Sequence, residues 1–293
     1  KMFRAQNVAP YFFILPFYIV FMTFSFIPIL RAFQISFTDW QGMRGGSWVG
    51  LDNYDLLLND PSFWQSLRNT VTLWIIATPI LTFGSLFLAV VLNQAWLRGR
   101  YLLRLAFLLP IVTSLVVSGL AFLLLLDPDY GPLGVVTEFL GLEPLNIKVD
   151  TRAAIPALVM ITVWRWLGWN MVIMLAGLQT LSQEVLEASV VDGAGFFRRL
   201  WYIILPMMRP IIVFATVLST IGMFNLFDEP FMLFGGSGGP QQSGLLLGPY
   251  LYRIGFERFN FGYASAMAYV IAAMIFVMSL AQVYYTARLE RDA

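Results

Sequence analysis

Six long apolar runs, separated by shorter polar segments, constrain the fold of this chain more than any other feature. The chain has 293 residues, of which 59% are hydrophobic and 12% are charged. About 20 consecutive apolar residues are enough for a helix to cross a bilayer. The runs of this length cover approximately residues 10–34, 69–93, 103–126, 154–178, 207–233 and 262–286. This pattern predicts an all-α, polytopic membrane protein with six transmembrane helices, in which residues 1–293 form a single transmembrane domain.

The residue types that are missing from the sequence exclude several functions. The chain contains no Cys and no His, so it offers neither a thiol nucleophile nor a Cys/His metal site. It also lacks a glycine-rich phosphate-binding loop of the GxxxxGK[ST] type, so we expect no ATP binding by that route. The sequence therefore predicts a protein that is not an enzyme, with no metal site and no cofactor of its own.

The distribution of charge predicts how the spans are oriented. With the N-terminus placed in the cytoplasm, the cytoplasmic segments carry ten Lys or Arg against five Asp or Glu, and the outer segments carry seven against twelve. Arg165 alone lies in the middle of a span. The short loop with Arg98, Arg100 and Arg104 is the strongest indicator of this orientation, because basic residues in short loops favour the cytoplasmic side. We therefore expect both termini and the loop 182–206 to be cytoplasmic.

The loop 182–206 is predicted to form two short helices joined by a glycine turn. Ser182 is a suitable N-cap for the first helix. We expect this helix to end at Gly193, because glycine readily adopts a left-handed conformation. In the second helix, Phe196 and Phe197 each precede another apolar side chain by four residues, which gives an apolar face. Such a helix–turn–helix segment is suited to binding a partner protein.

The same loop resembles a family motif. It reads Glu-Ala-Ser, then Asp-Gly-Ala-Gly, and finally Ile-Ile-Leu-Pro, which is similar to the "EAA…G…I-LP" loop of permease subunits of binding-protein-dependent ABC importers. In that family the loop docks into a cleft on the cytoplasmic ATPase. The resemblance implies an ATPase-coupling site made of Glu187, Ala188, Ser189, Asp192, Gly193, Ala194, Gly195, Ile203, Leu205 and Pro206. Ser189 stands where the motif more often has a second alanine, which is a small-for-small change.

The resemblance also implies a fold and a set of partners. The fold is that of type I ABC importer permeases. The protein partners are a second permease subunit that forms a heterodimer, a cytoplasmic ATPase dimer that holds ATP and Mg, and an extracytoplasmic solute-binding protein. Membrane lipid surrounds the assembly, and no nucleic acid is expected. The location is then the cytoplasmic (inner) membrane of a bacterium or an archaeon.

Three predicted outer segments, 37–68, 127–150 and 235–259, are longer than a simple connection requires. Each combines turn-forming residues with aromatic anchors. The Gly-Leu-Asp-Asn-Tyr stretch at 50–54 and the Gly-Gly-Pro at 238–240 resemble the matching loops of carbohydrate-importing permeases of the family. These segments either dock the solute-binding protein and receive its cargo or merely connect the spans.

Polar residues inside the predicted spans are candidates for a substrate path. The fourth run contains Arg165, Trp166, Trp169 and Asn170. Arg165 and Trp169 share one helix face, and Trp166 and Asn170 share a neighbouring face. Aromatic rings suit the C–H surfaces of a sugar, and Arg and Asn suit its hydroxyl groups. Alternatively, Arg165 forms a structural ion pair and the tryptophans face lipid.

The end of the fifth run adds two further candidates for the path, Asn225 and Asp228, the second of which is followed by Glu229. We place the two adjacent acids at the outer edge of the membrane. There they either bind substrate hydroxyl groups or are simply solvated.

These features together predict the transmembrane subunit of an ATP-driven ABC importer. Its cargo is predicted to be a carbohydrate (a sugar, an oligosaccharide or a polyol derivative), which passes from an external binding protein into the cytoplasm by alternating access. One alternative is a secondary, ion-coupled transporter, although neither mid-span carboxylates nor inverted repeats are evident. The other alternative is an ABC importer permease for a non-sugar solute.

Overall fold

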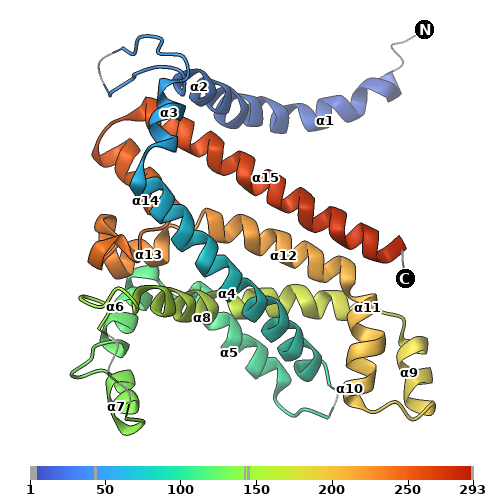
Figure 1. Ribbon diagram of the computed structural model, residues 1–293. Coiled ribbons are helices and arrows are strands. Elements are labelled where there is room, and N and C mark those ends of the chain that lie inside the picture. Colours follow the sequence, from blue (N-terminus) through green and yellow to red (C-terminus); the bar gives the residue numbers. More distant parts are fainter. Residues whose placement is uncertain (1–4, 43–44, 95, 142, 144–145, 292–293) are drawn as a thin grey trace. The chain divides into compact units, whose positions relative to one another are not determined.

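The computed structural model describes residues 5–42, 45–94, 96–141, 143 and 146–291. Regular structure in these ranges is helical (Figure 1), and the pairing of extended segments is limited to the isolated bridges Thr38–Trp48 and Gln41–Asn260. The predicted all-α class is therefore confirmed for the described part of the chain. The helices group into two compact units. Unit 1 contains the chain up to Asp60 together with Leu251–Ala272, and unit 2 contains Pro61–Tyr250 together with the chain from Ala273 onward.

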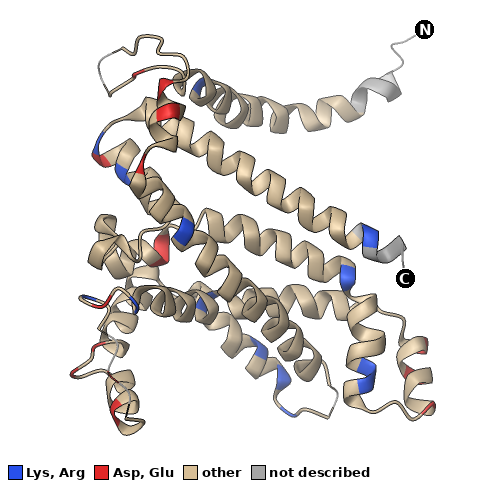
Figure 2. Ribbon diagram, viewed as in Figure 1, with Lys and Arg blue, Asp and Glu red and all other residues tan. Residues whose placement is uncertain are grey.

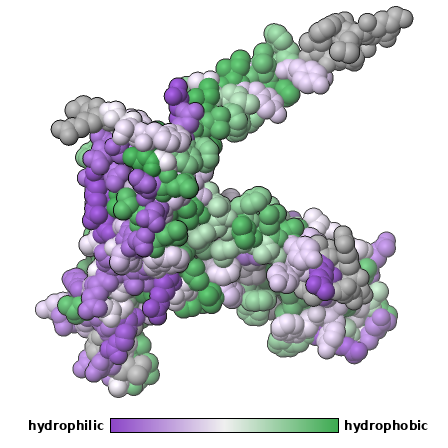
Figure 3. Space-filling model, turned by 45° about the horizontal axis from the view of Figure 1, so that its top comes forward, coloured by the Kyte–Doolittle hydropathy of each residue, from purple (hydrophilic) through white to green (hydrophobic). Residues whose placement is uncertain are grey.

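In unit 1, the first apolar run forms a continuous helical segment. It consists of α1 (Ala5–Phe21), a π-helical turn (Met22–Phe26) and α2 (Ile27–Ile35). The span Pro10–Ile35 buries none of its side chains within the structure, and Figure 3 shows hydrophobic atoms along it. Apolar side chains exposed to this extent are expected to face lipid or another protein.

Unit 1 also contains α3 (Asp52–Leu58), a π-helical turn (Arg253–Glu257) and the first part of α15 (Phe261–Arg291). Asn53, from the Gly-Leu-Asp-Asn-Tyr stretch, is 5% exposed. Its side-chain amide donates hydrogen bonds to the carbonyl oxygens of Ser36 and Thr38, at 2.9 and 2.8 Å. These carbonyls lie just beyond the end of α2, where a helix leaves its own acceptors unpaired. The stretch thus fixes α3 to the end of α2.

Unit 2 holds the remaining helices. In chain order they are α4 (Pro61–Leu92), α5 (Arg100–Val112), α6 (Leu115–Leu125), α7 (Pro132–Phe139), α8 (Ala154–Gln179), α9 (Gln183–Val191), α10 (Phe196–Arg199), a π-helical turn (Leu200–Ile204), α11 (Leu205–Met207), α12 (Arg209–Phe224), α13 (Asp228–Phe234), the 3₁₀ turns Gly235–Ser237 and Pro240–Gln242, and α14 (Leu247–Tyr252), whose last two residues belong to unit 1. The core of the unit forms where α4, α8 and α12 pack together. Leu81, Leu158, Ile161 and Met223 are among its buried side chains.

Five helical segments of the described chain are long and apolar enough to cross a membrane, and they correspond to five of the six predicted runs. They are Pro10–Ile35, Pro61–Leu92, Ala154–Gln179, Arg209–Ser237 and Phe261–Thr286. Figure 2 shows that these helices carry few charged residues along their length, and that charge is concentrated near helix ends and in connections. This distribution is that of a multi-pass membrane protein.

The third run, 103–126, is not the straight span that its hydropathy suggests. It consists of α5 and α6, which are bent by 97° relative to one another. The bend arises because Thr113 and Ser114 adopt extended backbone conformations, with ψ of 138° and 132°. The freed carbonyl oxygen of Thr113 accepts a hydrogen bond from Arg165 Nη1 at 3.5 Å. The number of spans reaches six if this bent pair crosses the membrane as one.

Two other boundaries also differ from the prediction. The second span begins at Pro61 and not near residue 69, because hydropathy does not register the polar first turns of a helix. The fifth run is interrupted between α12 and α13, at residues 225–227. This break allows α13 to pack against α6 and α8.

Candidate functional site

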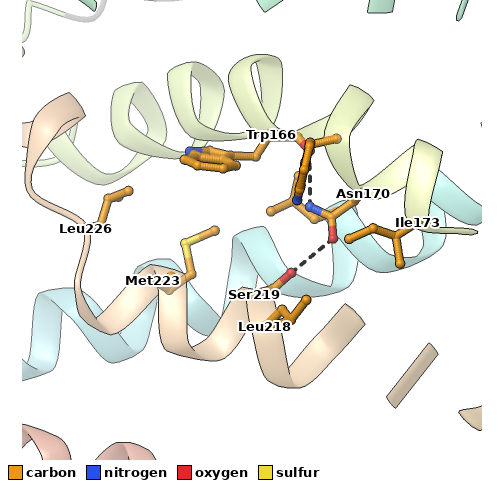
Figure 4. Close-up of a pocket in the computed structure, with 10 residues that line it drawn as sticks. Trp166, Asn170, Ile173, Leu218, Ser219, Met223 and Leu226 are labelled. Atoms are coloured by element: carbon orange, nitrogen blue, oxygen red, sulfur yellow. Dashed lines mark hydrogen bonds between the residues drawn. The ribbon is translucent and has the colours of Figure 1, made fainter. Parts of the chain in front are cut away.

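A cavity of about 90 Å³ lies between α4, α8 and α12, within unit 2 (Figure 4). It is lined by Leu81 from α4, by Trp166, Trp169, Asn170 and Ile173 from α8, and by Leu218, Ser219, Gly222, Met223 and Leu226 from α12 and the residues that follow it. The wall is mainly apolar and aromatic, with a small number of polar groups. Sites that bind small organic molecules have this composition.

Helical periodicity explains why α8 contributes these side chains. Trp166, Trp169, Asn170 and Ile173 are spaced by three and four residues and therefore lie on one helix face. On another face, Gly168 allows close packing against α5, since a Cβ at this position would lie 1.8 Å from the carbonyl oxygen of Phe107. The close contact with α5 thus sets which face of α8 is turned toward the cavity.

Asn170 and Ser219 supply the polar groups of the cavity wall. Asn170 is 5% exposed, and its side-chain N–H donates to the backbone oxygen of Trp166 at 3.1 Å. The Ser219 hydroxyl donates to Asn170 Oδ1 at 3.2 Å, so α8 and α12 are joined across the cavity (Figure 4). The Asn170 amide carries a second N–H and the hydroxyl has acceptor lone pairs, which suit them to a hydroxylated ligand.

The structure places Arg165 in an ion pair and not in the cavity wall. Its Nε lies 3.6 Å from Oε1 of Glu229, and the two side chains are 13% and 2% exposed. The indole N–H of Trp166 donates to the same oxygen at 2.9 Å. Of the two interpretations of Arg165, the structural ion pair is the one observed. The burial of Glu229 contradicts its interpretation as a solvated group.

The burial of Glu229 was not predicted from the sequence. The break after α12 directs α13 onto α8, and this packing brings the carboxylate against Arg165 in the middle of α8. Asn225 and Asp228 are both exposed and do not line the cavity, and the Asn225 amide donates to the Ile221 oxygen of its own helix at 2.8 Å. The cavity thus brings together Trp166, Trp169 and Asn170, but not the other three residues of the predicted path.

Sequence reasoning missed the contribution of α12 to the cavity. Ser219 and Gly222 are small residues one turn apart in an otherwise apolar helix, and this spacing was an available signal. A Cβ at Gly222 would meet no atom within 4 Å. The glycine therefore leaves space in the cavity and is not required for helix packing.

In the segment 182–206, which we call the coupling segment after its predicted role, the predicted glycine turn is confirmed. Gly193 has a φ of +74°. Its N–H donates to the Val190 oxygen at 3.0 Å, and the Ala194 N–H donates to the Ser189 oxygen at 2.9 Å. These two hydrogen bonds form a Schellman motif, which satisfies carbonyl groups at the end of α9. Ser182 occupies the N-cap position, but its side chain makes no capping hydrogen bond.

The residues of α9 differ in how they are presented. Glu187, Ala188 and Asp192 are exposed, together with Gly193 and Gly195, whereas Ala194 is half-buried. Ser189 is 5% exposed and donates to the Leu186 oxygen at 2.6 Å. A small side chain is required at this buried position, and serine meets that requirement as alanine does.

The second helix of the segment is divided into α10, a π-helical turn and α11. Ile203, Leu205 and Pro206 are half-buried. Phe196 and Leu200 pack on the core of unit 2, whereas the side chains of Phe197 and Trp201 are 70% and 62% exposed. The apolar side chains of this helix therefore lie on two separate faces and not on one. The first face packs on the core of unit 2, and the second is exposed.

A second cavity, of about 250 Å³, adjoins α9. It is lined by Val90, Asn93, Gln94, Leu178, Gln183, Leu186, Glu187, Val190, Phe196, Arg199 and Ile204. Glu187 and Arg199 place opposite charges on its wall, next to the amides of Asn93 and Gln94. The coupling segment therefore contains a polar concave surface as well as exposed apolar side chains.

Solved structures of bacterial transporters share this fold. A chain of the bacterial alginate ABC transporter, in complex with an alginate pentasaccharide-bound periplasmic protein, superimposes with a TM-score of 0.83 over 97% of this chain and 96% of that one, at 21% sequence identity. A likeness at this identity shows the fold, and it confirms the predicted permease architecture.

Sequence comparisons identify the family. The chain is 37% identical over 291 residues to the lactose transport system permease protein of Rhizobium radiobacter, covering 97% of this chain and 96% of that protein. It is 34% identical over 290 residues to the arabinooligosaccharides transport system permease protein of Halalkalibacterium halodurans, covering 99% and 91%. The model of the family described as "Binding-protein-dependent transport system inner membrane component" matches residues 3–291. The chain therefore belongs to the family of inner-membrane permease components of binding-protein-dependent transport systems.

Proposed function

We propose that this chain is the membrane-spanning subunit of an ATP-driven ABC importer whose cargo is a carbohydrate. The observation that carries the proposal is the composition of the cavity between α4, α8 and α12. Trp166 and Trp169 offer aromatic surface for the C–H face of a sugar ring, and Asn170 and Ser219 offer hydrogen-bonding groups for its hydroxyls. The permeases for lactose and for arabinooligosaccharides, which are similar over nearly the whole chain, support the same class of cargo.

The volume of the cavity supports transport by alternating access. Small-molecule sites usually measure about 300–1,000 Å³, whereas this cavity measures about 90 Å³. The conformation described here therefore offers less space than such a site usually has, and we expect the helices around the cavity to rearrange before cargo passes. A change of that kind is a rigid-body rearrangement of packed helices, of the sort that partner proteins can drive.

The energy for this change is proposed to come from a separate ATPase subunit that binds ATP and Mg. The coupling segment is the element that would contact it, because α9 ends in a Schellman turn and exposes Glu187, Ala188 and Asp192. A second permease subunit and an extracytoplasmic solute-binding protein complete the proposed assembly. Both termini and the coupling segment are proposed to be cytoplasmic, since basic residues dominate that set of loops.

Reconstituted transport tests the proposed function. The chain would be co-expressed with its partner subunits, placed in proteoliposomes with the solute-binding protein, and offered radiolabelled lactose, labelled arabinooligosaccharides and a labelled amino acid as a non-sugar control. We expect ATP-dependent uptake of a sugar and none of the amino acid. Trp169→Ala should lower sugar uptake about fivefold without loss of assembly, because an aromatic contact contributes about 1 kcal/mol. Uptake of the amino acid alone would refute the carbohydrate assignment.

A further inference from the structure

Glu229 is a carboxylate in an unusual place, at the start of α13 and only 1% exposed. Removing a carboxylate from water is costly unless it is paired and hydrogen-bonded. Two neighbouring residues of α8 provide that compensation. Arg165 Nε lies 3.6 Å from Glu229 Oε1, and Trp166 Nε1 donates to the same oxygen at 2.9 Å.

The two partners of Glu229 have different relations to the cavity. Arg165 does not line it, and its Nη1 is directed to the Thr113 oxygen at the bend between α5 and α6. Trp166 does line it, and the backbone oxygen of the same residue accepts the hydrogen bond that orients Asn170. Glu229 therefore contacts a residue of the cavity wall through its hydrogen bond with Trp166. The ion pair with Arg165 compensates the buried negative charge of Glu229.

We propose that Glu229 is a positioning residue for the cavity. Its carboxylate oxygen holds the Trp166 indole in one orientation in the cavity wall. The positive charge of Arg165 offsets the cost of burying the carboxylate. An indole has a single N–H donor, so one buried acceptor is enough to define its orientation. This inference rests on the proposed function, because it assigns the residue to the wall of the proposed carbohydrate path.

Two neutral double variants test whether the hydrogen-bond acceptor of Glu229 or its charge determines the orientation of the Trp166 indole. Arg165→Met/Glu229→Gln removes both charges but keeps an oxygen that can accept from the indole. Arg165→Met/Glu229→Leu removes the charges and the acceptor. Replacing both members of a buried ion pair by neutral groups avoids an unpaired buried charge, so we expect both variants to assemble. Glu138→Leu, at an exposed position of α7, is the matched control for loss of a carboxylate in the ¹⁹F measurement, and it should leave the Trp166 resonance unchanged.

The first measurement needs no cargo. 5-Fluorotryptophan is incorporated into the complex, and the ¹⁹F resonance of Trp166 is assigned as the one that disappears in Trp166→Phe. We expect this resonance to keep its position and width in the Gln double variant and to shift or broaden in the Leu double variant. An unchanged resonance in the Leu double variant would overturn the inference, because the indole would then be held without Glu229.

The second measurement is transport of whichever probe, lactose or an arabinooligosaccharide, the native complex takes up. The KM for uptake should rise about tenfold in the Leu double variant, as expected for loss of one buried hydrogen bond to a fixed group, with little change in the Gln double variant. When Trp166→Phe is added, the Gln and Leu variants should have the same KM. A different KM in that background, or failure of the Leu variant to assemble, contradicts a positioning role. Absence of any sugar uptake by the native complex refutes only the proposed function, since the ¹⁹F result stands without it.

Discussion

Replacing Gly193 by valine should destabilise the end of α9 without disturbing the spans. The residue has a φ of +74°, and a Cβ built on it would meet no atom within 4 Å. The free-energy cost of the substitution therefore comes from backbone conformation alone. It amounts to about 1–2 kcal/mol for an L-residue held in the left-handed region. A change of that size shifts a local opening equilibrium by about 5- to 30-fold.

Hydrogen exchange of the α9 backbone amides measures this opening directly. The Schellman bonds from Gly193 and Ala194 close the end of the helix, so their amides should exchange about 5- to 30-fold faster in Gly193→Val. In the same preparations, less ATPase should co-purify and substrate-stimulated ATP hydrolysis should fall. The membrane-inserted yield should be unchanged, since the substitution touches no core side chain.

Two further substitutions serve as controls for the backbone argument. Gly195 has a φ of −64° and also has open space at its Cβ, so Gly195→Val should leave the exchange of α9 unchanged. Gly193→Asn should have a smaller effect than Gly193→Val, because asparagine tolerates the left-handed region. Equal exchange in native protein and Gly193→Val, or an equal acceleration in Gly195→Val, would show that the turn conformation does not determine the stability of α9.

Other predictions follow from the packing of unit 2 and from the charge pattern. Gly168→Ala should lower the thermal unfolding midpoint of the purified complex, because its Cβ would lie 1.8 Å from the Phe107 oxygen and overpacking costs about 1–3 kcal/mol. Gly222→Val should block uptake while leaving that midpoint unchanged, since its side chain enters the open cavity. A cysteine at Gly141 should react with a membrane-impermeant thiol reagent in intact cells, and a cysteine at Gly99 should not; the reverse pattern would contradict cytoplasmic termini. Uptake into vesicles should persist when the proton gradient is collapsed and should cease without ATP, whereas an ion-coupled transporter would show the opposite dependence.

Features that depend on local sequence were predicted well. Hydropathy located all six runs as helical segments, and five of them form candidate spans without a sharp bend, because burial in a bilayer depends on the average polarity of a segment. The left-handed turn at Gly193 was also predicted correctly, since only a few residue types adopt that conformation readily. Family resemblance in the coupling loop pointed to the permease family that the comparisons show.

The cavity and the bend in the third run were decided by tertiary structure. Hydropathy does not register backbone dihedral angles, so the extended conformation of Thr113 and Ser114 was not visible in an apolar run. Glu229 follows Trp166 by 63 positions in the sequence. Its hydrogen-bond and ion-pair partners are therefore determined by the packing of α13 against α8. By itself the sequence determined which segments are helical, where α9 ends and to which family the chain belongs. The packing of α4, α8 and α12 determined which polar side chains meet, because contacts between distant segments depend on helix rotation and crossing, and the pattern along any one helix does not specify these.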